Sequence, residues 1–260
     1  MIQPYLARIS IFPVKSLDGA ALSQVSVLTS GALQHDREYA LFDQKGRFVN
    51  GKRNAKIHLL RSQFDRDYQQ LSLQVQGTDN SVTFDLDKER LEIEAWLSDY
   101  FGLPVNLKQN NLTGFPDDTN ASGPTIISAA TLAEVASWFP GVTVAEMRDR
   151  LRANLEIDGV PPFWEDRLFT QAGDSFKFQI GEVVFAGINP CARCIVSTRD
   201  SKTAVATENF QKVFVSKRKE TLPNWTTPER FDHFYRLSIN TKIPSSEVGK
   251  ILRIGAPVSI

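Results

Sequence analysis

Apolar and polar residues alternate in short runs along much of this chain, a pattern typical of half-buried strands. Residues 5–14 and 24–43 contain β-branched and aromatic runs that are broken by Gly and Asp, and these runs predict strands. Residues 68–86 alternate polar with apolar on both sides of a Gly-Thr-Asp-Asn turn, which predicts a hairpin. From residue 175 to the end, further short alternating runs predict mostly β-structure.

Helical periodicity is limited to a few segments. In residues 88–101 the apolar side chains recur every three or four positions and Gly102 follows, so a helix is predicted to end there. Thr-Leu-Ala-Glu at the start of residues 131–139 is a capping-box pattern that predicts a second helix. Residues 145–152 are predicted to be helical or extended, and residues 208–218 to be helical.

These elements together predict a mixed α/β fold in which β-structure predominates. The recurrence of short strands between turns makes a barrel plausible. Residues 109–124 are dense in Asn, Asp, Gly and Pro, as in a linker or a functional loop. We therefore expect two β-rich halves, residues 1–120 and residues 121–260, in a chain long enough for two packed domains.

Composition excludes several classes of partner. The 30 Lys and Arg residues balance the 30 Asp and Glu residues, so no overall field attracts nucleic acid or a membrane surface. An anion site must then be a local arrangement. No run approaches the roughly 18 apolar residues that span a bilayer. The N-terminus does not resemble a signal peptide, and two cysteines provide no disulfide framework. We expect a cytoplasmic protein with no nucleic-acid or membrane partner.

Both cysteines lie in residues 189–198, as C-x-x-C. Half of a zinc site would need a second ligand pair, and the three histidines show no paired spacing. A thioredoxin-like dithiol normally opens a helix, whereas residues 195–198 favour a strand. Arg193 directly precedes Cys194, and a neighbouring cation favours the thiolate that ligates metals. The residues leave these alternatives open, together with two buried structural cysteines.

Lys15 and Ser16 follow the first predicted strand. An ammonium and a hydroxyl at the entrance to a loop can bind a phosphate together, although a solvated lysine at a strand end is the commoner case. Residues 35–38, His-Asp-Arg-Glu, are either an exposed charged turn or part of a site. The chain contains no Walker loop, no G-x-G-x-x-G fingerprint, no H-E-x-x-H helix and no nucleic-acid-binding signature.

Four motifs, taken in order, resemble those of the MOSC proteins, the relatives of the C-terminal domain of molybdenum cofactor sulfurase. They are Phe-Pro-Val-Lys-Ser at 12–16, Asp-Arg-Glu-Tyr at 36–39, Arg-Ala-Asn-Leu at 152–155 and Pro-Cys-Ala-Arg-Cys-Ile at 190–195. The group with a MOSC N-terminal β-barrel region is most similar; it includes the mitochondrial amidoxime-reducing component and YcbX-type proteins. The resemblance covers nearly the whole chain and implies a MOSC-type β-barrel domain preceded by a β-rich N-terminal domain.

The resemblance also implies that the chain binds the molybdenum cofactor, a molybdenum ion held by the dithiolene of one molybdopterin. The cysteine that binds the metal in this family follows Arg in Cys-x-Arg-Cys, and it is Cys194 here, whereas Cys191 matches the non-ligating cysteine. Ala192 stands where the family often has Ser. The family residues that hold the pterin and its phosphate match Lys15, Ser16, Arg37, Ser122, Gly123, Arg152, Asn154 and Arg193.

By the same resemblance the chain is expected to be a molybdenum-dependent oxidoreductase that reduces small N-hydroxylated compounds. Two cysteines cannot hold a four-cysteine iron–sulfur cluster and also ligate molybdenum, and no dinucleotide-binding loop is visible. We therefore expect electrons from a separate ferredoxin-like or cytochrome-like protein. The alternative is a non-catalytic protein that carries the molybdenum cofactor, or a sulfur on Cys194.

Overall fold

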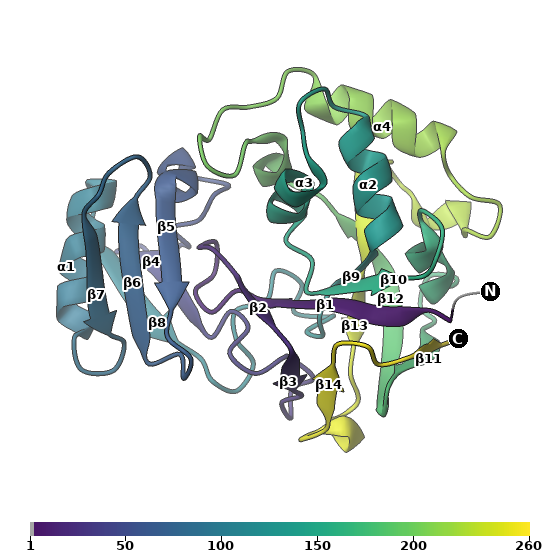
Figure 1. The fold of residues 1–260 in the computed structure, drawn as a ribbon, viewed down its shortest axis with the longest axis horizontal. Coiled ribbons are helices and arrows are strands. Elements are labelled where there is room, and N and C mark those ends of the chain that lie inside the picture. Colours follow the sequence, from purple (N-terminus) through teal and green to yellow (C-terminus); the bar gives the residue numbers. More distant parts are fainter. Residues whose placement is uncertain (1–2) are drawn as a thin grey trace.

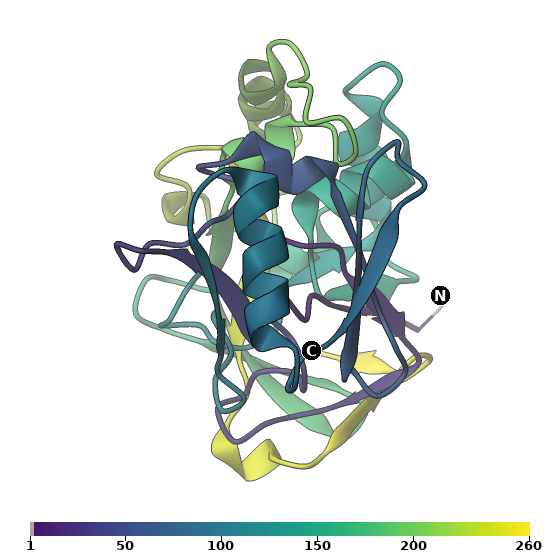
Figure 2. The same cartoon turned by 90° about the vertical axis from the view of Figure 1, so that its left-hand side faces the viewer.

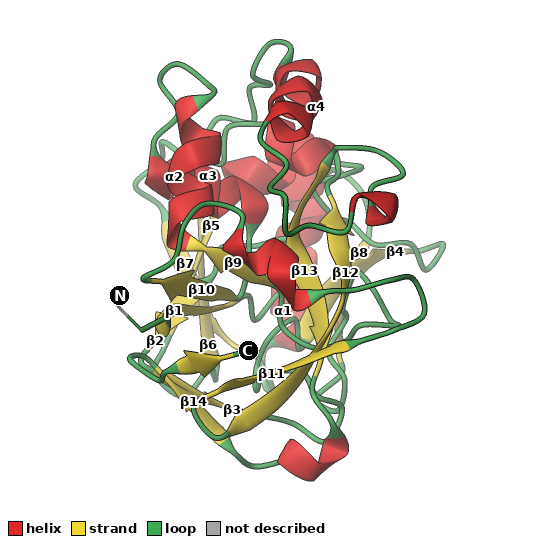
Figure 3. Ribbon diagram, turned by 90° about the vertical axis from the view of Figure 1, so that its right-hand side faces the viewer, coloured by secondary structure: helices red, strands yellow, loops and turns green. Residues whose placement is uncertain are grey.

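The computed structural model describes residues 3–260, and its main feature is one large curled sheet (Figures 1 and 3). This sheet has eight strands, in the order β15 (Val258–Ser259), β11 (Phe176–Ile180), β12 (Val183–Ala192), β13 (Arg236–Lys242), β9 (Ile126–Ser128), β10 (Leu155–Asp158), β1 (Tyr5–Ile11) and β2 (Ala20–Leu22). The predicted strand-rich mixed fold is confirmed.

The curled sheet is a half-barrel whose two sides are joined by the ends of the chain. The Leu6 amide donates to Ala256 O over 2.9 Å, and the Gly255 amide donates to Leu6 O over 2.8 Å. The Val258 amide donates to Pro4 O over 2.8 Å. These bonds satisfy backbone groups on the side of β1 that β2 leaves unpaired, because β2 covers only the second half of β1.

Smaller sheets lie beside the large one (Figure 2). The pairs are β4 (Tyr39–Asp43) with β8 (Val105–Gln109) and β3 (Gln24–Ser26) with β14 (Ile251–Arg253), and the three-stranded sheet is β5 (Leu60–Phe64), β6 (Gln70–Val75) and β7 (Ser81–Asp85). The predicted hairpin is confirmed by the antiparallel pairing of β6 with β7. Helix α1 (Arg90–Phe101) covers strands β4 to β8 with Ile93, Leu97 and Phe101, and Gly102 ends it in the left-handed conformation, as predicted.

Three more helices lie at one end of the curled sheet (Figure 3). They are α2 (Ala129–Ser137), α3 (Val144–Leu151) and α4 (Phe210–Glu220). The predicted capping box at Thr131 is wrong, because α2 begins earlier and Ser128 caps it by accepting from the Thr131 amide over 3.0 Å. The hydroxyl of Thr131 instead donates a hydrogen bond to the buried Glu165. None of the helices among residues 3–260 has the length and apolar character to cross a membrane.

The first strand joins two cores. Its side chains Leu6, Ile9 and Ile11 lie in the core of the large sheet, whereas the residues that follow it, Val14 and Leu17, lie in the core of the N-terminal strands. The boundary near residue 120 stays a prediction. A cut there would remove β1 and β2 from the sheet that they complete.

One carboxyl group is buried where α2 begins. Glu165 is 1% exposed, and its Oε2 accepts from the Thr131 hydroxyl over 2.9 Å while its Oε1 has no partner among residues 3–260. The Thr131 oxygen also accepts from the Phe163 amide over 2.6 Å and lies 2.7 Å from the Ser128 hydroxyl, so this carboxyl group belongs to a buried hydrogen-bond network. Burial, reinforced by the charge of Asp166, raises the pKa of Glu165 to about 7.

The substitution Glu165→Gln is expected to stabilise the protein above neutral pH. Because the folded pKa of Glu165 lies above its unfolded value, the wild type loses stability as the pH rises through that window to about 7. Gln cannot ionise, so the variant should gain on the order of 2–3 kcal/mol over the wild type at pH 8 and little at pH 4.5. Denaturant unfolding across this pH range measures the difference.

Glu247→Gln is the matched control with the opposite sign. Glu247 is buried too, but the hydrogen bond from Lys250 lowers its pKa, so its contribution is present at neutral pH and is lost as the pH falls. This variant should be less stable than the wild type at pH 8. A Glu165→Gln variant that is less stable than the wild type at pH 8 would contradict the assignment of Glu165.

Candidate functional site

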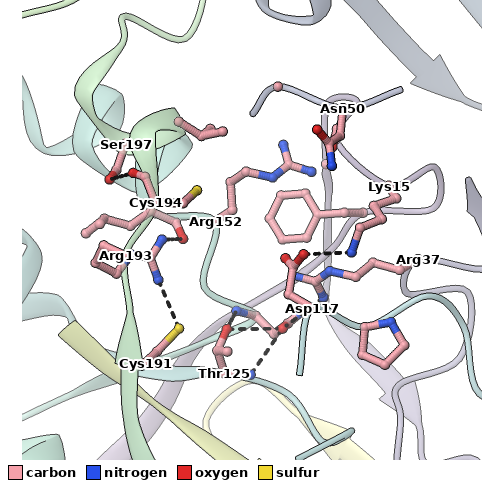
Figure 4. Close-up of a pocket in the computed structure, with 18 of the residues that line it drawn as sticks. Lys15, Arg37, Asn50, Asp117, Thr125, Arg152, Cys191, Arg193, Cys194 and Ser197 are labelled. Atoms are coloured by element: carbon pink, nitrogen blue, oxygen red, sulfur yellow. Dashed lines mark hydrogen bonds and ion pairs between the residues drawn. The ribbon is translucent and has the colours of Figure 1, made fainter. Parts of the chain in front are cut away.

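A cavity of about 780 Å³ lies between the large sheet and the N-terminal strands. All nine residues that the sequence analysis selected line it: Lys15, Ser16, Arg37, Ser122, Gly123, Arg152, Asn154, Arg193 and Cys194. Figure 4 shows Cys194 and Arg193 on one side, Lys15, Arg37 and Asp117 on the other, and Arg152 between them. Segments more than 170 residues apart in sequence therefore meet around one space.

The cavity is strongly cationic, although the chain has no net charge. Its lining contains five aspartates and no glutamate, against ten basic side chains: Lys15, Arg37, Lys52, Arg61, Arg150, Arg152, Arg193, Arg199, Lys202 and Arg236. Because several of these cations lie away from bulk water, their field is less screened than it would be on an open surface. An anion is the chemical class of ligand that this lining favours.

Lys15 lies four residues after β1 and lines the cavity. Its ammonium, in a residue that is 5% exposed, donates to Phe115 O and to Asp117 Oδ1, each over 2.8 Å. Burial lowers the pKa of Lys15, and Asp117 opposes this effect. Although burial alone would raise the pKa of Asp117, the charges of Lys15 and Arg37 hold it at about 2. Ser16 follows in the left-handed region at φ 75° and turns the chain along the wall.

Arg37 is held by two neighbours. Its guanidinium forms an ion pair with Asp36 and lies 3.4 Å from Asn154 Oδ1. Burial acts to lower the pKa of Arg37, but Asp36 and Asp117 outweigh it and raise the pKa. Asn154 is 1% exposed, and both polar atoms of its side chain have a partner: Oδ1 accepts from the Thr125 amide over 3.1 Å, and Nδ2 donates to Ser10 O over 3.0 Å. Asn154 thus positions the wall and has no free polar atom.

Arg152 is a cation of the cavity whose guanidinium has no hydrogen-bond or ion-pair partner among residues 3–260. It ends α3 in the left-handed conformation at φ 54°, so its side chain turns from the helix into the cavity. Its guanidinium stacks 4.0 Å from the centre of the Phe12 ring and forms no hydrogen bond or ion pair with any of residues 3–260. Burial and the charge of Arg37 lower the pKa of Arg152 to about 10. Such a guanidinium is poised to accept an anion.

The cysteine segment differs from the prediction. Residues Ile195–Thr198 form a 3-10 helix and not a strand, with the Ser197 amide donating to Cys194 O over 3.3 Å. Cys194 O also accepts from the Ser197 hydroxyl over 3.0 Å and from the Tyr235 hydroxyl over 3.3 Å. Both cysteines are free thiols. Cys194 Sγ forms no hydrogen bond with any of residues 3–260.

The neighbouring cation also acts differently from the prediction. The guanidinium of Arg193 donates to Leu151 O and approaches Cys191 Sγ at 3.5 Å, not Cys194. Residues two apart in an extended chain point the same way, so Arg193 and Cys191 share a side while the next residue points elsewhere. The Nε of Arg193 is buried without a partner among residues 3–260. Arg193 thus braces the end of α3 against β12.

Ser122 and Gly123 shape the cavity wall. The Ser122 hydroxyl donates to Ser30 O over 2.9 Å, and the Gly123 amide donates to Thr241 O over 3.0 Å. A Cβ at Gly123 would lie 2.7 Å from Thr241 O, so no other residue fits without a shift of the backbone. Gly123 thus fastens the loop that precedes β9 to β13 of the large sheet, and Ser122 fastens it to the turn that contains Ser30.

Sequence reasoning missed other cavity residues. Asp117 lies in the predicted functional loop, residues 109–124, and the density of acidic and turn residues in that loop was the only local signal. His58 is 8% exposed, and burial with the charges of Arg199 and Arg152 lowers its pKa to about 4. No sequence motif marks His58. Residues 3–260 include no cluster of three or more His, Cys, Asp or Glu that could hold a metal ion, so the zinc alternative finds no ligand set there.

Comparisons with known proteins agree with the order of the motifs. Residues 3–104 match the model of the MOSC N-terminal beta barrel domain, and residues 120–237 match the model of the MOSC domain. Curated relatives named molybdenum cofactor sulfurase include those of Drosophila mojavensis (26% identical over 223 residues, 74% of this chain and 28% of the relative), Oryza sativa subsp. japonica (27% over 237 residues, 73% and 28%) and Danio rerio (25% over 250 residues, 78% and 29%). The chain therefore spans less than a third of the length of these relatives.

Replacing the unpaired cation should separate binding from stability. Arg152→Met removes the repulsion between Arg152 and Arg37, so the free energy of unfolding without ligand should rise by about 0.5–1 kcal/mol. Inorganic phosphate should raise the melting temperature of the wild type but not that of the variant. The measurement is thermal unfolding with and without phosphate at constant ionic strength.

Arg167→Met is the control, since Arg167 also stacks on an aromatic ring, 4.2 Å from that of Trp225, but does not line the cavity. It should keep the response to phosphate. If phosphate stabilises Arg152→Met as much as the wild type, Arg152 is not an anion contact.

Proposed function

This chain belongs to the family that joins a MOSC N-terminal beta barrel domain to a MOSC domain, and we propose that it is a molybdenum-cofactor-dependent oxidoreductase that reduces N-hydroxylated compounds. The observation that carries the proposal is the convergence of seven motif residues, including the free thiol of Cys194, on one cationic cavity. A second observation supports it: one guanidinium in that cavity lacks any partner among residues 3–260.

The residues present fit a pterin cofactor with a phosphate. Arg152 offers free donors, and Lys15 and Arg37 lie in the same cavity. Charge-assisted hydrogen bonds to a phosphate stabilise binding by on the order of 1.5–3 kcal/mol each when they are shielded from water. The thiol of Cys194 makes no competing hydrogen bond and lines the same cavity, so it can serve as the metal ligand. The cavity volume lies in the range of small-molecule and cofactor sites.

When bound, the cofactor would supply two-electron redox chemistry at molybdenum, and the protein would supply binding, orientation and electrostatics. Cys194 would be the protein ligand that orients the metal, and Arg152, Lys15 and Arg37 would anchor the phosphate. Asn154 would hold the segments that carry these cations. Reduction of an N-hydroxy group takes up two electrons and two protons and releases the reduced nitrogen compound and one water. A separate electron-transfer protein would deliver the electrons.

A second candidate follows from the relatives. Those proteins are named molybdenum cofactor sulfurase, so the chain could share a role in handling the cofactor or its sulfur without turnover of a small substrate. The two candidates differ in one measurement. Protein loaded with cofactor reduces an N-hydroxylated test compound with a chemical electron donor only if it is a reductase. Loaded protein that holds molybdenum and turns nothing over would favour the carrier.

Metal content should distinguish the two cysteines. Protein made in a cofactor-competent host is expected to hold about one molybdenum per chain, the stoichiometry of a single ligating cysteine. Cys194→Ala should abolish activity and change the spectrum of the metal, whereas Cys191→Ala, the matched control, should be milder. Elemental analysis and electron paramagnetic resonance make the comparison. Equal losses in both variants would indicate a dithiol or zinc site instead.

Electron supply is the second point to measure. Residues 3–260 offer two cysteines and no glycine-rich dinucleotide loop, so we expect no reduction with NADH alone. Activity should appear with a strong chemical reductant, or with a ferredoxin-like or cytochrome-like partner that docks weakly and is sensitive to salt. Steady-state assays with each donor test this. Robust turnover by the pure chain with NADH would reveal a further cofactor site.

A further inference from the structure

Asp117 is the acidic side chain that faces the cations of the cavity from the loop between the two halves (Figure 4). Its carboxylate accepts from Lys15 over 2.8 Å, and its pKa of about 2 keeps it charged at any physiological pH. The cavity therefore contains its own anion at the end where Lys15 and Arg37 lie.

The ion pair is asymmetric. The side chain of Lys15 is 6% exposed and has a second acceptor, Phe115 O, so it is fixed in the wall. The side chain of Asp117 is 64% exposed and has no hydrogen-bond partner other than Lys15 among residues 3–260. Asp117 can turn toward water without breaking another contact, whereas Lys15 cannot leave.

The two neighbouring aspartates behave differently. Asp36 accepts from the Phe12 amide over 2.9 Å as well as from Arg37, so it is part of the frame. Asp118, one residue further along the loop, accepts from Asn240 over 3.2 Å and makes no contact with Lys15. Of these three aspartates, Asp117 alone combines an ion pair with Lys15 and a largely exposed carboxylate that has no other hydrogen bond.

We propose that Asp117 is an exchangeable counter-anion that determines which ligands the cavity accepts: it neutralises Lys15 in the empty protein and gives way to a doubly charged phosphate. The inference rests on the proposed anion site and names its selectivity. A singly charged anion that replaces Asp117 exchanges one negative charge for another and gains little. A phosphate dianion adds one further negative charge among cations that still exceed the aspartates. Without the carboxylate, a buried Lys15 would lack a charged partner whenever the cavity is empty.

The test compares the binding of inorganic phosphate and nitrate to the apoprotein at pH 8 by isothermal titration calorimetry. Asp117→Asn keeps the size of the side chain and an oxygen for Lys15 but removes the charge. It should bind phosphate about tenfold more tightly than the wild type, the scale expected for one nearby unit charge in a partly screened site. It should also bind nitrate, which the wild type should not. Asp118→Asn is the matched control and should change phosphate affinity by less than about twofold.

Each outcome decides the matter. If Asp117→Asn binds phosphate no more tightly than the wild type, or if Asp118→Asn gains as much phosphate affinity, Asp117 is not an exchangeable counter-anion, while the anion site itself is unaffected. If neither protein binds phosphate, the anion site and the proposed function fail together. Hydrogen exchange of wild-type residues 115–118 is independent of any variant: phosphate should increase exchange there, and an unchanged rate would overturn the proposal.

Discussion

The site depends on the hydrogen bonds that Asn154 makes between three parts of the chain. Its backbone oxygen accepts from the Ser10 amide over 2.7 Å and its side-chain amide donates back to Ser10 O. Its side-chain oxygen accepts from Thr125. These bonds hold the end of β1, the start of β10 and the entry to β9 together, and each of those segments leads directly into the cavity wall. Because Asn154 is 1% exposed, water does not compete for these bonds.

Because the segments that Asn154 connects continue into the cavity wall, the backbone brings the cations together. Arg152, the residue after α3, precedes Asn154 by two positions, and Lys15 and Ser16 follow Ser10 by five and six positions. Arg37 lies against the amide itself. A cluster of like charges opposes folding, so the protein retains it only with compensation, which Asp36 and Asp117 supply. Arg152 forms no ion pair among residues 3–260, and the proposed anion would neutralise it.

Several elements followed from sequence because their causes are local. The hairpin of β6 and β7 and the end of α1 at Gly102 depend on alternation and on a left-handed terminal residue, and both were predicted. The start of α2 was missed because the hydroxyl of Thr131 could either cap a helix or bond to a buried group, and in the fold it donates to the buried Glu165. Residues 195–198 have strand-like composition but form a helical turn, and the tertiary contact at this turn is a hydrogen bond from the Tyr235 hydroxyl, about forty residues away, to Cys194 O.

The sequence by itself determined the strand-rich class, the family and nine of the residues that line one cavity. What each of those residues is free to do was decided only by the tertiary structure. A free donor depends on which acceptors lie nearby, and those acceptors come from distant segments. Asn154 and Ser122 form hydrogen bonds within the protein, and Arg193 faces Cys191. Arg152 remains without a hydrogen-bond or ion-pair partner among the described residues. Local sequence specifies the chemistry of each side chain, whereas packing determines which side chains are left to bind a ligand.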